Sequence, residues 1–173
     1  LTNTYGISFK FMNAGEFLDE IGKLTEEEIK EAEAVADDLI GGAKYNAMSR
    51  DYVVRSCKVY VTAKKMLSLY DCNAFTAPCP DLCSTRRFSE EKFTLCMTHS
   101  LNDENGISSA CEYDINSVIG KVIMTNLSGK APYMGNTNAI VFDKEGHMIP
   151  FHKFNDNTIE DIADKTNLYM TFH

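Results

Sequence analysis

The fold is decided by residues 107–129, ISSACEYDINSVIGKVIMTNLSG, which have the pattern of a strand, a turn and a helix. The first five of these residues are small or apolar, as is typical of a short buried strand. Asp114 or Asn116 can cap the helix that follows, and its apolar residues recur at helical spacing until Gly129 ends it. We therefore expect a buried strand to lead into a helix start close to Glu112.

The residues before this stretch alternate in the same way between strand and helix patterns. Strands are expected at residues 7–12, 73–77 and 107–111. Helices are expected at residues 25–42, 49–70, 93–101 and 114–129, the first of them opened by a Thr25 and Glu28 capping box. Such alternation is typical of a doubly wound parallel α/β sheet of the Rossmann or flavodoxin kind. We expect this domain to span residues 1–129.

The pattern changes after residue 130. Strand signals at residues 139–142 and 147–154 are joined by a turn at 143–146, which favours an antiparallel pair. A short helix is expected at 158–164, before a last strand from Leu168. Residues 130–173 are thus expected to begin a β-rich domain. Because the chain starts at Leu1 and stops in a strand pattern, we expect it to be a fragment of a longer protein.

Composition excludes several classes of protein. The 173 residues include 25 acidic and 17 basic ones, a formal charge of −8 that repels nucleic acid and anionic lipid. No apolar run is long enough to span a membrane. The six cysteines are expected to be reduced thiols of a cytoplasmic protein, because the chain has enough apolar residues for a core and no signal peptide.

The expected fold places two loops where ligands gather, beyond the carboxyl ends of the strands. These loops are residues 78–87 and 112–114. The Glu112 carboxylate would lie where a buried strand meets a helix start, so its natural partner is a hard divalent cation or a proton. The alternative is a carboxylate that only interacts with the helix dipole. Arg86 and Arg87 could bind an anionic group, although exposed loop arginines are the ordinary interpretation.

Several motifs between residues 77 and 135 together resemble those of the L-fucose isomerase-like proteins, a family of sugar aldose-ketose isomerases. The motifs are APCP at 77–80, Cys96 in an apolar helix, NDENGI at 102–107, ACEYD at 110–114 and LSGKAPYMG at 127–135. The resemblance implies two doubly wound domains and a β-rich C-terminal domain, of which this chain would hold the middle one and the start of the last. It also implies a homo-oligomer.

The resemblance further implies a divalent metal, usually Mn²⁺. Glu112 matches the first ligand of the family, and His173 is the candidate for the third. The second ligand is an acid in the family but falls on Asn136 here, which can donate a carbonyl oxygen and cannot act as a general base. Glu112 and Asn136 would also hold the catalytic positions.

Two functions follow from these observations. The first is aldose-ketose interconversion of the L-fucose or L-arabinose type, through a cis-enediolate, on a small-molecule sugar. In the second, the protein keeps the isomerase fold and binds a sugar or a partner without catalysis, because Asn136 replaces the acid. A plain α/β domain without a site is a third alternative.

Overall fold

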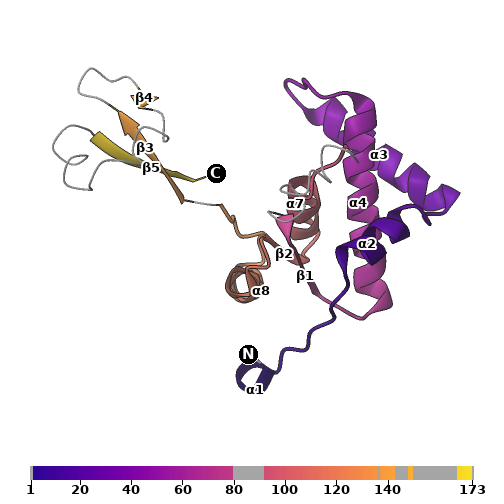
Figure 1. Ribbon diagram of the computed structural model, residues 1–173, viewed down its shortest axis with the longest axis horizontal. Helices are drawn as coiled ribbons and strands as arrows, with labels where there is room; N and C mark the ends of the chain where they lie inside the picture. The colour runs from indigo at the N-terminus through magenta and orange to yellow at the C-terminus, as the bar shows by residue number, and fades with distance from the viewer. Residues whose placement is uncertain (1, 80–91, 136, 143–147, 150–166, 173) are drawn as a thin grey trace. The chain divides into compact units, whose positions relative to one another are not determined.

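A computed structural model describes residues 2–79, 92–135, 137–142, 148–149 and 167–172 (Figure 1). The chain divides into two compact units, Leu1–Pro132 and Tyr133–His173. No helix in these described ranges is long and apolar enough to cross a membrane.

The first unit opens with four helices: α1 (Thr2–Tyr5), α2 (Ala14–Ile21), α3 (Glu26–Gly42) and α4 (Arg50–Leu69). The capping box predicted for α3 is present, since Thr25 Oγ1 accepts from the Glu28 amide and the Glu28 carboxylate accepts from the Thr25 amide. Ser49 is the N-cap of α4, because its hydroxyl oxygen accepts from the Tyr52 amide. The sequence prediction of these two helices is therefore confirmed.

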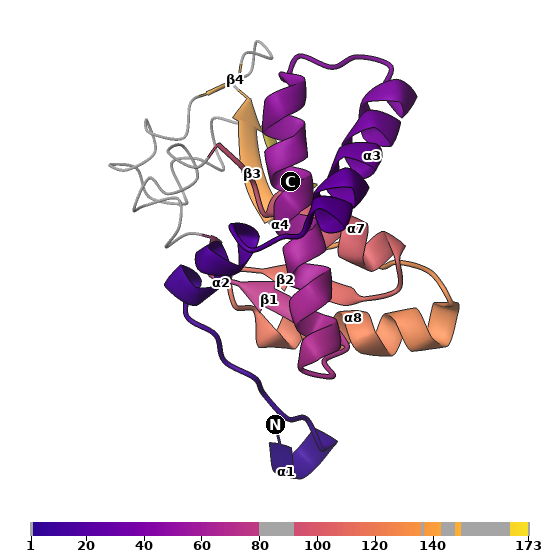
Figure 2. The same ribbon diagram turned by 90° about the vertical axis from the view of Figure 1, so that its right-hand side faces the viewer.

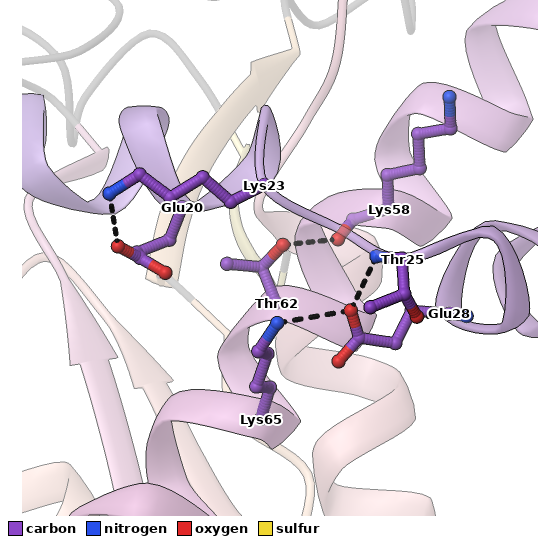
Figure 3. Close-up of polar contacts among 7 residues, drawn as sticks. All are labelled: Glu20, Lys23, Thr25, Glu28, Lys58, Thr62 and Lys65. Atoms are coloured by element: carbon purple, nitrogen blue, oxygen red, sulfur yellow. Dashed lines mark hydrogen bonds and ion pairs between the residues drawn. The ribbon is translucent and has the colours of Figure 1, made fainter.

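Helices α3 and α4 pack together as an antiparallel pair around small side chains. Ala32 and Ala36 of α3 are completely buried, and so is Cys57 of α4. Small residues let the two backbones approach closely, and the acidic face of α3 stays outside. At the edge of this contact Lys65 Nζ lies 3.0 Å from the Glu28 carboxylate, which ties the cap of α3 to α4 (Figure 3).

A parallel sheet of two strands follows, β1 (Ala74–Ala77) and β2 (Ser108–Cys111), with Phe75 opposite Ser109. Helix α7 (Cys96–Glu104) connects the strands, and α8 (Ile115–Ser128) follows β2. Figures 1 and 2 show the sheet between α8 on one face and α4 with α7 on the other. A mixed α/β fold with a parallel sheet is thus confirmed, and the described residues of this unit place two strands in that sheet.

Three expectations differ from the structure. Residues 7–12 form no strand here, and the chain between α1 and α2 has neither helix nor strand. Helix α2 was not expected, although Asn13 and Glu16 form a capping box at its start. Helix α7 begins at Cys96 rather than at residue 93. Phe93 and Leu95, whose apolar side chains suggested the earlier start, are buried but lie in the loop before the helix.

The second unit contains an antiparallel sheet of three strands in the order β4, β3, β5. These strands are β3 (Thr137–Phe142), β4 (Met148–Ile149) and β5 (Asn167–Phe172). The strand signals predicted at 139–142 and from Leu168 agree with β3 and β5. The turn expected at 143–146 and the helix expected at 158–164 lie outside the described residues.

Candidate functional site

The carboxyl ends of β1 and β2 lie side by side, because the strands are parallel and in register from Ala74 opposite Ser108 to Ala77 opposite Cys111. The chain leaves β1 through Pro78 and leaves β2 through Glu112. The Tyr113 amide donates to the Ala77 carbonyl at 3.3 Å and extends the contact beyond the last strand pair. This end of the sheet is where a doubly wound protein would bind its ligand.

Glu112 lies in a turn with unusual backbone geometry. Glu112 has a φ of 64° and Tyr113 a φ of 54°, so two successive residues with side chains adopt the left-handed conformation. Each costs free energy relative to glycine, on the order of 1 kcal/mol. The Asp114 amide donates a hydrogen bond to the Cys111 carbonyl at 3.1 Å and so closes the turn. Glu112 is exposed. The sequence thus maintains a strained turn that presents a carboxylate to solvent.

The helix after this turn is fixed by Asp114. Its carboxylate accepts hydrogen bonds from the Ser117 amide, at 3.0 Å, and from the Ser117 hydroxyl. Asp114, one of the two predicted candidates, is therefore the N-cap of α8. These hydrogen bonds from Ser117 lower the pKa of the Asp114 carboxyl. Of the two acids at the turn, Asp114 therefore has a structural role, and Glu112 remains the candidate for chemistry.

A buried polar cluster lies beneath this edge of the sheet and is centred on His99 of α7. Its Nδ1 is 2.8 Å from Ser109 Oγ, and its Nε2 is 3.6 Å from Cys79 Sγ. Asn102 Nδ2 also donates to Ser109 Oγ, at 3.3 Å, so both ring nitrogens of His99 and the Asn102 amide meet polar atoms inside this cluster. Burial, with a smaller effect from Lys121, lowers the pKa of His99 to about 4. His99 is therefore a neutral imidazole at pH 7.

A second buried pair adjoins this cluster. Lys121 of α8 forms an ion pair with Asp103 of α7, and their side chains are only 7% and 12% exposed. Lys121 Nζ also donates to the Ser109 carbonyl at 2.6 Å, and Asp103 Oδ1 accepts from the Ser109 amide at 2.9 Å. Both charges are thus paired and hydrogen-bonded, as burial requires.

The thiols near the site belong to different environments. Burial, reinforced by the Glu112 carboxylate, raises the pKa of Cys111. Cys57, inside the helical core, has its pKa raised by burial to about 11. No disulfide joins the five cysteines that the structure describes, which agrees with the expected reduced state for these five.

The structure describes Glu112 and none of the other predicted site residues. Arg86, Arg87, Asn136 and His173 lie outside the described residues. In the part of the chain that is described, no three His, Cys, Asp or Glu side chains come close enough together to hold a metal ion. The predicted ligand set is therefore represented by one carboxylate at the expected end of β2.

The buried polar cluster is not predicted by the sequence. Nothing in the sequence shows that His99 and Ser109 meet, because their contact depends on how α7 packs on β2. Lys121 did carry a signal, since it interrupts an otherwise apolar face of α8 between Val118 and Val122. A lysine in that position indicates a buried acidic partner.

The chain is similar in sequence to a known isomerase. Over 138 residues the chain is 26% identical to sulfoquinovose isomerase from Clostridium sp. (strain MSTE9), and this match covers 79% of the chain and 29% of the relative. No family model matches the chain, and no solved structure matches it. The chain thus spans less than a third of that relative, and over most of its own length it is similar to part of a sugar isomerase.

Proposed function

We propose that this chain is part of a sugar isomerase-like protein that interconverts an aldose and a ketose. The similarity to sulfoquinovose isomerase over 138 residues carries the proposal. The motif run from residue 77 to residue 135 supports it, and so does the strained turn that presents Glu112 beyond β2. A substrate of the L-fucose or L-arabinose type belongs to the same proposal.

The proposal includes a domain organisation. Residues 1–129 would form a doubly wound middle domain, and residues 130–173 would begin a β-rich C-terminal domain. The parallel pair β1–β2 with helices on both faces supports the first part, and the antiparallel strands β3, β4 and β5 support the second. We further propose a cytoplasmic homo-oligomer that binds neither nucleic acid nor membrane, in keeping with the formal charge of −8.

The donor chemistry of the proposed site fits Mn²⁺. Glu112 would supply a carboxylate oxygen, Asn136 an amide oxygen and His173 an imidazole nitrogen, and oxygen with nitrogen donors suits this ion. The ion would polarise the sugar carbonyl and stabilise negative charge on the enediolate oxygens. Arg86 and Arg87 could add an interaction with an anionic group of the substrate.

The side chains themselves would orient the sugar and move one proton. The reaction shifts a proton between adjacent carbons, through a cis-enediolate, and a carboxylate near neutral pH can accept and return it. Glu112 is exposed at the end of β2, and its carboxylate would be the group that accepts and returns this proton. Asn136 has no proton to exchange as an acid or base, so it would act by positioning alone.

Deuterium exchange tests this proposal. The full-length protein that carries these residues is incubated with MnCl₂ and pentoses or 6-deoxyhexoses in D₂O, and NMR follows deuterium at C1 and C2. We expect exchange that falls at least about a hundredfold in Glu112→Gln. The matched control Glu104→Gln changes an exposed acid of α7 and should retain activity. Failure of every such sugar to exchange would refute the isomerase function.

A second function is favoured by Asn136 itself. An amide in place of the acid removes a negative charge from the ligand set, which would leave a protein that binds a sugar or a partner without turnover. Asn136→Asp separates the two functions. A gain of both Mn²⁺ affinity, measured by calorimetry, and exchange would support the non-catalytic form, whereas a loss of activity from an active parent would support the isomerase.

A further inference from the structure

The two outer edges of the β1–β2 sheet are not equivalent. Along a strand, the N–H and C=O of one residue point to the same side, and those of the next residue point to the other side. The N–H and C=O of Ser109 bind Asp103 and Lys121, so they point away from β1. The buried ion pair therefore occupies the hydrogen-bonding positions that a third strand would need. The outer edge of β2 is closed.

Among the described residues, by the same reasoning, nothing pairs with the outer edge of β1. The Ala77 carbonyl accepts from the Tyr113 amide, so Ala77 points toward β2, and alternation turns Ala74 and Thr76 outward. No described residue binds the main chain of Thr76. Its hydroxyl oxygen is also buried without a hydrogen-bond partner among the described residues. The main chain and the buried hydroxyl of Thr76 are thus polar groups that could still accept or donate hydrogen bonds.

The segment Ile7–Met12 is a strand-length piece of chain that contacts Tyr70, just before β1, and leads into helix α2, which packs on β1. Phe9 and Phe11 stack at 6.0 Å between ring centroids, which places residues i and i+2 on one side, as in an extended chain. Lys10 Nζ lies 4.3 Å from the centre of the Tyr70 ring, four residues before β1. The following helix α2 is anchored on β1 through Phe17 and Phe75, whose ring centroids are 6.2 Å apart.

The side chains of this segment are more exposed than those of a half-buried strand. Phe11 is 83% exposed and Phe9 is 41% exposed, although both alternate with polar residues as in a half-buried strand. An isolated strand forms no hydrogen bonds and stays irregular, which explains why the structure records no strand at these residues. The open edge and the unpaired segment thus lack complementary partners.

We propose that the outer edge of β1 is a strand-docking edge and that its occupant is Ile7–Met12 of the same chain. The segment would run parallel to β1, because α2, α3 and α4 form the long crossover that parallel neighbours require. The sheet then has β2 as its terminal strand and grows only past β1. Docking buries Phe9 or its neighbours and gives the Thr76 main chain its partners.

Amide hydrogen exchange on the full chain tests the docking. We expect the Thr76 amide, and alternate amides within Ile7–Met12, to exchange at least about tenfold more slowly than in an unstructured peptide. Proline at consecutive positions supplies a matched pair, since only one of Phe9→Pro and Lys10→Pro removes a donor that faces β1. One variant should release the Thr76 amide, and the Ser109 amide, bound to Asp103, should stay protected in both.

Three outcomes would overturn the proposal. Residues 7–12 could exchange at the unstructured rate, or both proline variants could leave Thr76 unchanged. Alternatively, protection could rise with protein concentration together with dimer formation in sedimentation, which would assign the occupant to a second copy of the chain.

Discussion

The buried imidazole of His99 makes the stability of the first unit depend on pH. Burial and the nearby Lys121 lower the pKa of His99 from its ordinary 6.5 to about 4. Between these two values the unfolded chain binds a proton that the folded chain does not, so the free energy of unfolding falls as pH decreases through this window. The full difference, 6.5 less about 4, corresponds to about 3 kcal/mol at about 1.4 kcal/mol per pH unit.

About 2 kcal/mol of this loss should appear between pH 7 and pH 5. Urea unfolding followed by circular dichroism at 222 nm measures it, because every described helix lies in the first unit. His99→Asn keeps a short polar side chain without the titration, and the other three histidines and the acids are the same in both chains. The variant should therefore show a pH dependence flatter by about 2 kcal/mol over this range.

An independent measurement gives the pKa itself. In an NMR titration of the folded chain, the His99 ring protons should not shift between pH 8 and pH 5. Titration of this ring near pH 6.5, or equal pH dependence of stability in the parent and His99→Asn, would refute the reasoning that the ring is buried and neutral.

Three further predictions concern the core and the caps. Lys121→Met leaves a buried carboxylate unpaired and should cost about 3 kcal/mol in urea unfolding, whereas Arg50→Ala, which breaks an exposed ion pair, should leave the stability almost unchanged; equal effects would contradict the assigned burial. Cys57, completely buried and with a pKa of about 11, should be alkylated by iodoacetamide at pH 8 far more slowly than the exposed Cys96, and mass spectrometry of both peptides decides this. Thr25→Ala should lower the free energy of unfolding by about 1 kcal/mol through loss of the α3 cap, and Thr25→Ser should restore most of it.

Local sequence signals predicted the elements whose ends are fixed by short-range chemistry. The Thr25 capping box, the Ser49 cap and the left-handed Gly129 each determine a helix end within a few residues, and all three are present. The strand β2 also appears within one residue of its expected start. These features depend on neighbours in sequence, so a single sequence contains them.

Features that depend on tertiary packing could not be predicted. Ile123 and Leu127 are among the apolar residues that recur at helical spacing before Gly129, but they are 50% and 83% exposed, while Lys121 is the one buried residue of α8. The ion pair with Asp103 decides this orientation, and it joins two helices across β2. For the candidate site, the sequence located Glu112 at the strand end, whereas its left-handed conformation became visible only in the structure.

The turn at Glu112 and Tyr113 has a consequence for how the sequence can evolve. Glycine at either position would relieve backbone strain on the order of 1 kcal/mol, so a substitution by glycine there would make the domain more stable. A chain that nevertheless carries a carboxylate and an aromatic ring at these positions has given up stability for the side chains. Selection for stability alone should therefore enrich glycine at position 112, and selection for activity should remove it.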